Sequence, residues 1–137
     1  MRLSTVGRYA LRAMVDLAQH DGQGPILRRD VAERQAISSD YLAQLFVRLR
    51  RAGLVESILG PGGGYVLAKR ASEISAGEVL RAVDESLELV PCATGQEGAC
   101  HRVEECSTHL LWKRVGEAVA DVVDTVTLAE LCAHDEQ

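Results

Sequence analysis

The stretch RRDVAERQAISSDYLAQLFVRLRRAGLVESILGPGGGYVLA, residues 28–68, decides the fold of this chain. It predicts a first helix over residues 28–35 and, after a turn of three residues, a second helix. The pair Ser38-Ser39 can cap this second helix, its apolar residues share one face, and Gly53 stands where the helix should end. Two helices at this spacing are typical of a helix-turn-helix.

Two short strand-like runs follow the second helix, at residues 54–59 and 65–68. Between them lies GPGGG, residues 60–64, which predicts a tight, exposed turn. A helix-turn-helix followed at once by a hairpin predicts a winged helix, so the predicted fold class is mainly α with a small β wing. Glycines also let a backbone approach a phosphate closely, although a flexible hairpin tip would have the same composition.

The flanking segments predict further helices. Ser4 can cap a helix whose apolar residues recur at three and four positions as far as Leu17. After the wing, Ser75 and Glu78 have the spacing of a capping box, which would start a helix that reaches about Asp84.

The chain is expected to divide into three parts. Residues 1–84 form the winged helix-turn-helix domain, residues 85–107 lack periodicity and form a loop, and residues 108–137 hold a long amphipathic helix and a short one. A domain this small cannot easily bury the apolar stripe of the long helix, at about 108–124. We therefore predict a dimerisation helix that a second copy covers. Alternatively, this helix folds back onto its own winged helix.

The composition and charge of the 137 residues limit the function. No apolar run approaches the roughly 20 residues that cross a bilayer, and the first residues lack the pattern of a secretory signal. We expect a cytoplasmic protein without a membrane partner. Although the net charge is -5, residues 1–70 carry 11 Lys and Arg against 6 Asp and Glu, whereas residues 71–137 carry 4 against 14. The basic half is where double-stranded DNA would bind.

Three of the four cysteines share one short segment with a histidine: Cys92, Cys100, Cys106 and His109. Thiolates and imidazole are ligands that zinc, copper and iron–sulfur clusters prefer. A reducing cytoplasm favours metal binding or redox sensing over disulfides. A cluster-based regulator, a structural zinc site and a metal-free thiol sensor all stay open. We do not expect an enzyme, because no nucleophile–base pair, phosphate-binding loop or paired-carboxylate pocket is visible.

Three runs of the sequence carry a resemblance to a known family: RLSTVGRYALRAMVDLA, ISSDYLAQLFVRLRRAGLVESILGPGGGYVLAK and CSTHLLWKRVGEAVADVVDTVTLAEL. They resemble the Rrf-two family of bacterial winged-helix regulators, closest to its iron–sulfur cluster regulator branch. The resemblance implies a homodimeric transcription factor that binds a pseudo-palindromic operator, holds a [2Fe–2S] cluster, and controls cluster biogenesis or stress genes. The family also includes nitric oxide and redox sensors, so a repressor of that kind is the alternative.

The same resemblance implies four cluster ligands: Cys92, Cys100, Cys106 and His109. Their spacing, C-x7-C-x5-C-x2-H, is two residues longer in the first gap than in the branch, which a glycine-containing loop can absorb. His101 is the rival for His109. Some relatives instead take a ligand from the first helix of the partner subunit, where Asp16 is the one acidic candidate in this chain.

The resemblance further implies DNA contacts at the start of the recognition helix and at the wing tip: Ser38, Ser39, Tyr41, Ala43, Gln44, Pro61 and Gly62. Gln44 is best suited to read a base, because its amide can pair with adenine. Four arginines are expected to contact the DNA backbone: Arg2, Arg28, Arg50 and Arg51. Similar proteins often carry glutamate in place of Ala43 and arginine in place of Leu59, so their operator preference does not simply carry over.

Overall fold

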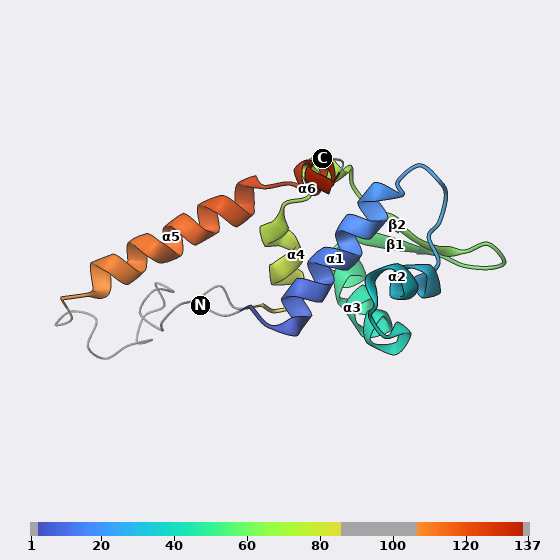
Figure 1. The fold of residues 1–137 in the computed structure, drawn as a ribbon, viewed down its shortest axis with the longest axis horizontal. Coiled ribbons are helices and arrows are strands. Elements are labelled where there is room, and N and C mark those ends of the chain that lie inside the picture. The colour runs from blue at the N-terminus through green and yellow to red at the C-terminus, as the bar shows by residue number, and fades with distance from the viewer. Residues whose placement is uncertain (1–2, 86–106, 136–137) are drawn as a thin grey trace.

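The computed structural model describes residues 3–85 and 107–135. Its elements are α1 (Thr5–Gln19), α2 (Arg28–Gln35), α3 (Ser39–Arg51), β1 (Val55–Ile58), β2 (Gly64–Leu67), η1 (Ala71–Glu73), α4 (Ala76–Ala82), α5 (His109–Thr125) and α6 (Leu128–Asp135). Figure 1 shows α1 to α4 and the hairpin in one body, α5 running away from it, and α6 beside α1. The predicted fold class is confirmed, whereas most of the predicted loop at 85–107 lies outside the described residues.

The helix-turn-helix lies where the sequence predicted it. Ser4 and Ser38 cap α1 and α3, and each hydroxyl accepts a backbone N–H of the first turn, at 3.4 and 3.0 Å. Between α2 and α3 the chain turns at Ala36, whose φ of 54° is left-handed. Gly53 just past α3 has a φ of 78°, a conformation that glycine adopts without strain.

One face of α3 is buried against the rest of the winged helix. Its buried side chains, each at most 3% exposed, are Leu42, Leu45, Phe46 and Leu49. Phe46 also stacks on Tyr65 of β2, with ring centroids 4.2 Å apart and planes 15° apart. Burial of one such side chain contributes about 1.5–3 kcal/mol, and a ring pair adds about 0.5–1.5 kcal/mol. Packing therefore holds α3 and the wing in a fixed relation.

The wing is an antiparallel hairpin of β1 and β2 in which Ile58 lies opposite Gly64. On the other edge of β2, Tyr65 exchanges two backbone hydrogen bonds with Ile26, at 2.8 and 2.9 Å. A Cβ atom on Gly63 would collide with the backbone oxygen of Ile58, and one on Gly64 with that of Ile26. Gly63 and Gly64 are therefore required by the close approach of backbone segments.

The two C-terminal helices differ in their environment. α6 packs onto the winged helix, with Leu128 fully buried. The structure buries no residue of α5; Leu110 is 70% exposed and Val122 is 60% exposed. The alternative in which α5 folds back onto its own winged helix is therefore not what the structure shows. Its apolar stripe is uncovered in the single chain, and the second copy stays a prediction.

A buried carboxylate joins α1 to α2. Asp16 is 0% exposed and accepts hydrogen bonds from Nε and Nη2 of Arg34, at 3.0 and 2.7 Å, and from Nε2 of Gln35, at 3.0 Å. Burial by itself would raise the pKa of Asp16, but the hydrogen bonds from Arg34 and Gln35 and the charges of Arg34 and His20 outweigh it and lower that pKa. The ionised carboxylate therefore holds α2 against α1.

We expect Asp16→Asn to lower the free energy of unfolding by about 3 kcal/mol at neutral pH, because Arg34 loses its charge partner. This is the low end of the usual range, since the Arg34 side chain is 37% exposed. The folded pKa of Asp16 lies below its unfolded value of about 3.9. The stabilisation is therefore complete above that value and is lost as the pH falls through the folded pKa, where the two proteins should converge.

Urea unfolding of both proteins from neutral to acidic pH measures this difference. The control is Glu73→Gln, which removes the charge of the exposed pair with Arg70 and should leave the unfolding midpoint unchanged. Equal midpoints for Asp16→Asn and wild type at neutral pH would contradict the prediction.

Candidate functional site

The amino end of α3 is open to solvent. Ser38 is exposed, and Oγ of Ser39 accepts a hydrogen bond of 3.0 Å from Nε of Arg28 on α2. The first N–H groups of a helix carry partial positive charge, and the guanidinium adds a full charge, so this end can attract a phosphate. The structure thus brings three of the predicted DNA-binding residues together.

Beyond its first turn, α3 presents Gln44 to solvent, whereas Ala43 is half-buried. The adjacent Leu42 and Leu45 point into the core, so packing determines which side of the helix faces outward. A glutamine amide carries both donors and an acceptor. The placement of Gln44 is therefore compatible with contact to a base edge in the major groove.

Tyr41 has a packing role that the sequence did not reveal. Its half-buried ring meets Tyr9 of α1 edge-on, with centroids 5.7 Å apart and planes 84° apart. The guanidinium of Arg12 lies 5.1 Å from the centroid of the Tyr9 ring. Tyr41 therefore helps to hold α3 against α1, and its contact with DNA stays a prediction.

The tip of the wing combines bare backbone with an apolar side chain. Pro61 and Gly62 are both exposed, and Gly62 has a φ of 76°. Next to them Leu59 is 92% exposed. A single exposed leucine is common on protein surfaces, so Leu59 leaves the wing tip without a charged side chain and does not by itself indicate a partner.

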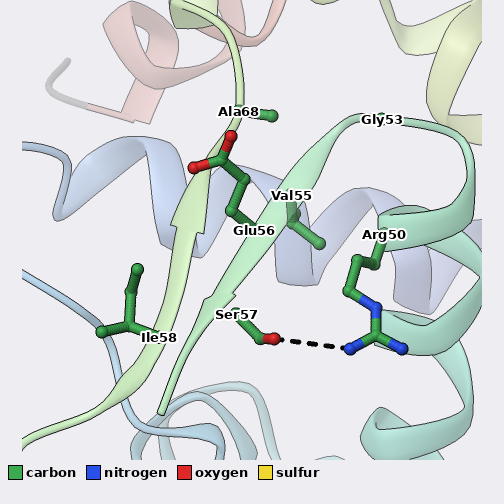
Figure 2. A pocket seen from close by; sticks show the side chains of 7 residues that line it. All are labelled: Arg50, Gly53, Val55, Glu56, Ser57, Ile58 and Ala68. Atoms are coloured by element: carbon green, nitrogen blue, oxygen red, sulfur yellow. Dashed lines mark hydrogen bonds between the residues drawn. The ribbon is translucent and has the colours of Figure 1, made fainter.

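A groove separates the end of α3 from the outer face of β1. Figure 2 shows Arg50 and Ser57 facing each other across it, and Nη1 of Arg50 donates to Oγ of Ser57 at 3.4 Å. The residues that line the groove are Arg50, Gly53, Val55, Glu56, Ser57, Ile58 and Ala68. A guanidinium has five N–H donors, so Arg50 can touch the wing and still contact a phosphate. Arg51 next to it is exposed.

Of the predicted cluster ligands, the structure describes His109. It is the first residue of α5, and its Nδ1 atom is shielded from solvent without a hydrogen-bond partner in the described part of the chain. Such an atom is costly unless something binds it, so this donor fits a metal-bound imidazole. Cys92, Cys100 and Cys106, the rival His101, and Arg2 lie outside the described residues.

Two further side chains with metal-binding atoms, those of Asp16 and Cys132, are engaged elsewhere. Asp16 is enclosed with Arg34 and is 0% exposed, which does not suit a ligand offered to a partner subunit. The Sγ atom of Cys132 lies 3.9 Å from the backbone oxygen of Val15, so this half-buried thiol packs against α1. Within residues 3–85 and 107–135, no group of three or more metal-binding side chains comes together.

Two ion pairs between described helices are among those that were not predicted from the sequence. Asp16 pairs with Arg34, and Arg81 of α4 pairs with Asp124 of α5. The sequence did contain a sign of the first pair, because an acidic residue next to Leu17 on an apolar helix face needs a buried partner. The second had none, since its members are 43 residues apart.

The length and apolar character of the described helices show whether any of them could cross a membrane. Across residues 3–85 and 107–135, no helix has both the length and the apolar character that crossing a bilayer would require.

Comparison with known proteins extends the interpretation to nearly the whole chain. A family model described as Rrf2, iron-dependent transcriptional regulator, matches residues 3–134. The HTH-type transcriptional regulator IscR of Erwinia tasmaniensis is 50% identical over 136 residues, which cover 99% of this chain and 81% of that relative. The IscR of Serratia proteamaculans is 51% identical, with 99% and 82% covered.

Solved structures agree with this assignment. The IscR of T. potens is 36% identical, with a TM-score of 0.79 and coverage of 100% of this chain and 89% of the other. CymR, the global cysteine regulator of B. subtilis, is 35% identical, with a TM-score of 0.82 and coverage of 98% of each chain. The resemblance predicted from the sequence is therefore confirmed, and the chain belongs to the Rrf2 family of winged-helix, DNA-binding transcriptional regulators.

Proposed function

We propose that the chain acts as a homodimer on a pseudo-palindromic operator in double-stranded DNA, and that it holds a [2Fe–2S] cluster on Cys92, Cys100, Cys106 and His109. Its operator affinity would follow the state of that cluster, and its targets would be genes for iron–sulfur cluster biogenesis or stress. The proposal includes a cytoplasmic location and no enzymatic activity.

One observation carries the cluster part of the proposal. Nδ1 of His109 is buried and lacks a hydrogen-bond partner among the described residues, at the start of α5. Three cysteines in the preceding 17 residues supply the thiolates that such a centre needs. When bound, the cluster supplies a redox-active iron centre that can be lost, and one nitrogen ligand makes it more easily perturbed than four thiolates. The relatives named IscR support the same assignment.

The dimer part of the proposal is supported by the surface of α5. Its exposed and half-buried apolar residues form a groove with Arg114, lined by Leu110, Leu111, Arg114, Val115 and Ala118. An uncovered apolar stripe of this length on a free helix is unfavourable in water, and a second α5 is its natural complement. A two-fold dimer would present two recognition helices to successive major grooves.

The position of His109 gives a route from the cluster to the DNA. His109 is the first residue of α5, so any displacement of its imidazole acts directly on that helix. The other end of α5 is joined to α4 through Arg81 and Asp124. Buried side chains and a hydrogen bond of 3.3 Å from Arg48 to the backbone oxygen of Val83 connect α4 to α3. Binding of the cluster can then change operator affinity only as far as the cluster binds one arrangement of the dimer more tightly than another.

The cluster prediction concerns His109→Ala. We expect anaerobically purified wild type to absorb visible light and to contain about two iron and two sulfide per chain, as a [2Fe–2S] centre requires. His109→Ala should lose most of both, because one of four ligands is gone. His109→Cys should keep the cluster at a lower reduction potential, since a nitrogen ligand raises it. Cys132→Ser, outside the ligand set, is the control.

Iron, sulfide and zinc analysis, visible spectra and operator binding at fixed salt measure these effects. Loaded and apo wild type should differ in operator affinity by about 5–150-fold. Unchanged iron in His109→Ala, or equal affinities of the loaded and apo proteins, would contradict the proposal. Zinc in place of iron would favour a zinc-stabilised regulator, and metal-free protein whose binding follows oxidation would favour a thiol or redox sensor.

The DNA-reading prediction compares Gln44→Ala with Arg51→Ala. Gln44→Ala should lose about 1–3 kcal/mol on an operator that wild type selects from random duplexes, because a bidentate base contact is lost. Its affinity for unselected DNA should stay unchanged. Arg51→Ala should weaken both and reduce the slope of log affinity against log salt by about 1 per lost phosphate contact. Fluorescence anisotropy gives these values, and equal losses of Gln44→Ala on both duplexes would refute base reading.

The wing prediction concerns Leu59→Arg. A guanidinium at this exposed position can enter the minor groove or contact a phosphate, whereas leucine cannot. Operator affinity should rise, and the salt slope should steepen by about 0.9 for each added contact. Leu59→Gln, which is polar but uncharged, is the matched control and should leave the slope unchanged. If the arginine variant kept the wild-type slope, the wing tip would not lie on DNA.

A further inference from the structure

The carboxyl end of α5 is joined to the winged helix by a short backbone joint. Ala76 donates to the backbone oxygen of Val126 at 2.9 Å, and Leu128 donates to that of Ile74 at 2.9 Å. The side chains of Ile74 and Leu128 are both fully buried. The chain that leaves α5 is therefore held in place, but these contacts lie beyond the end of the helix and do not by themselves set its direction.

A single side-chain fork connects α5 itself with α4. Nη1 and Nη2 of Arg81 donate to Oδ1 and Oδ2 of Asp124, at 2.6 and 3.0 Å. The hydrogen bond from Arg81 lowers the pKa of Asp124; burial opposes this shift and the charge of Arg81 adds to it, so the carboxylate is ionised in the pair. Two parallel N–H···O bonds fix orientation as well as distance.

The first turn of α4 is shaped to accept this carboxylate. Gly77 is buried, and a Cβ atom there would collide with Oδ1 of Asp124. The absence of a side chain at Gly77 therefore lets Asp124 lie directly against α4 while it forks with Arg81. Arg81, Asp124 and Gly77 together form the α4–α5 clamp.

The clamp is not explained by stability alone. The side chains of Arg81 and Asp124 are 51% and 42% exposed, and pairs this exposed contribute little to the free energy of folding. The residues of α5 are half-buried or exposed, and its contacts with the winged helix gather at α4, so little packing within the chain orients this helix. A helix of 17 residues is about 25 Å long, so a change of about 10° at the clamp moves its far end by about 4 Å.

We propose that the α4–α5 clamp sets the angle between the dimerisation helix and the DNA-reading head, and so determines which spacing of operator half-sites the dimer accepts. This inference rests on the proposed homodimer. The head follows α4 because Val79, Leu80 and Val83 are buried in it. In a two-fold dimer, half-sites lie about 10–10.5 base pairs apart or at multiples of that spacing, so a small change of angle at each clamp changes the separation of the two recognition helices.

The test uses the full-length dimer and synthetic duplexes. An operator that wild type selects from random DNA is rebuilt as a series in which the distance between its half-sites changes by one base pair at a time. Wild type should prefer one spacing by about tenfold or more, and Arg81→Gln and Asp124→Asn should each flatten that preference severalfold, as expected for loss of a coupling interaction. The double variant should add little to either single variant, because both remove the same interaction.

Three further variants distinguish an effect on the direction of α5 from an effect on folding. Arg70→Gln removes a surface ion pair with Glu73, of 2.8 Å, that does not touch α5, and should keep the wild-type spacing profile. Gly77→Ala keeps both charges but displaces Asp124, and should shift or flatten the profile. Arg81→Lys keeps the positive charge but cannot form the two parallel hydrogen bonds, so it should keep only part of the wild-type spacing preference. Thermal unfolding and sedimentation should show that all variants are folded dimers.

The spacing profile and the oligomeric state together distinguish failure of this inference from failure of the proposed homodimer. A dimeric wild type with a sharp profile that Arg81→Gln, Asp124→Asn and Gly77→Ala all retain would overturn this inference and leave the proposed function standing. A monomeric wild type, or one without any preference for spacing, would overturn the proposed homodimer and this inference with it.

Discussion

The burial of one face of α3 is the constraint on which the rest of the structure depends. Phe46 and three leucines of this helix are almost fully removed from solvent, and the Phe46 ring stacks on Tyr65 of the wing. Rotation of α3 about its axis would expose these side chains and cost several kcal/mol, since each contributes about 1.5–3 kcal/mol by its burial. The same packing leaves Ser38 and Gln44 outside. The surface proposed to read DNA is thus a consequence of how the opposite face is buried.

In contrast to α3, α5 has no fully buried face. It has an amphipathic pattern, but the structure buries none of its residues, and its contacts with the winged helix gather at α4. His109 lies at the distant end, seventeen residues of helix away from the joint. In the proposed regulator, a helix held at one end and carrying a ligand at the other would pass a displacement along its length of about 25 Å. This geometry suits a regulator whose sensing and DNA-reading parts are separate in the sequence.

Two ion pairs between the described helices show how burial changes what a charge pair does. Asp16 is fully enclosed, so its pair with Arg34 determines whether α2 can stay against α1. Arg81 and Asp124 are about half exposed, where water competes for both charges. The first pair is required for stability, whereas the second gains its importance from direction, since little else in the chain orients α5.

Local patterns in the sequence determined most of the secondary structure and the family. The bounds of α2, the serine caps of α1 and α3, the glycine hairpin and the capping box at Ser75 were all predicted, because each depends on residues within a few positions of one another. The proposed ligand set also comes from the sequence, through the family resemblance, and stays a prediction; of its four members the structure describes His109. Only the tertiary structure decided the packing role of Tyr41, the exposure of α5, and the partners of Asp16 and Asp124. These contacts join residues far apart in the chain, and they form only where the packing of whole helices brings the side chains together.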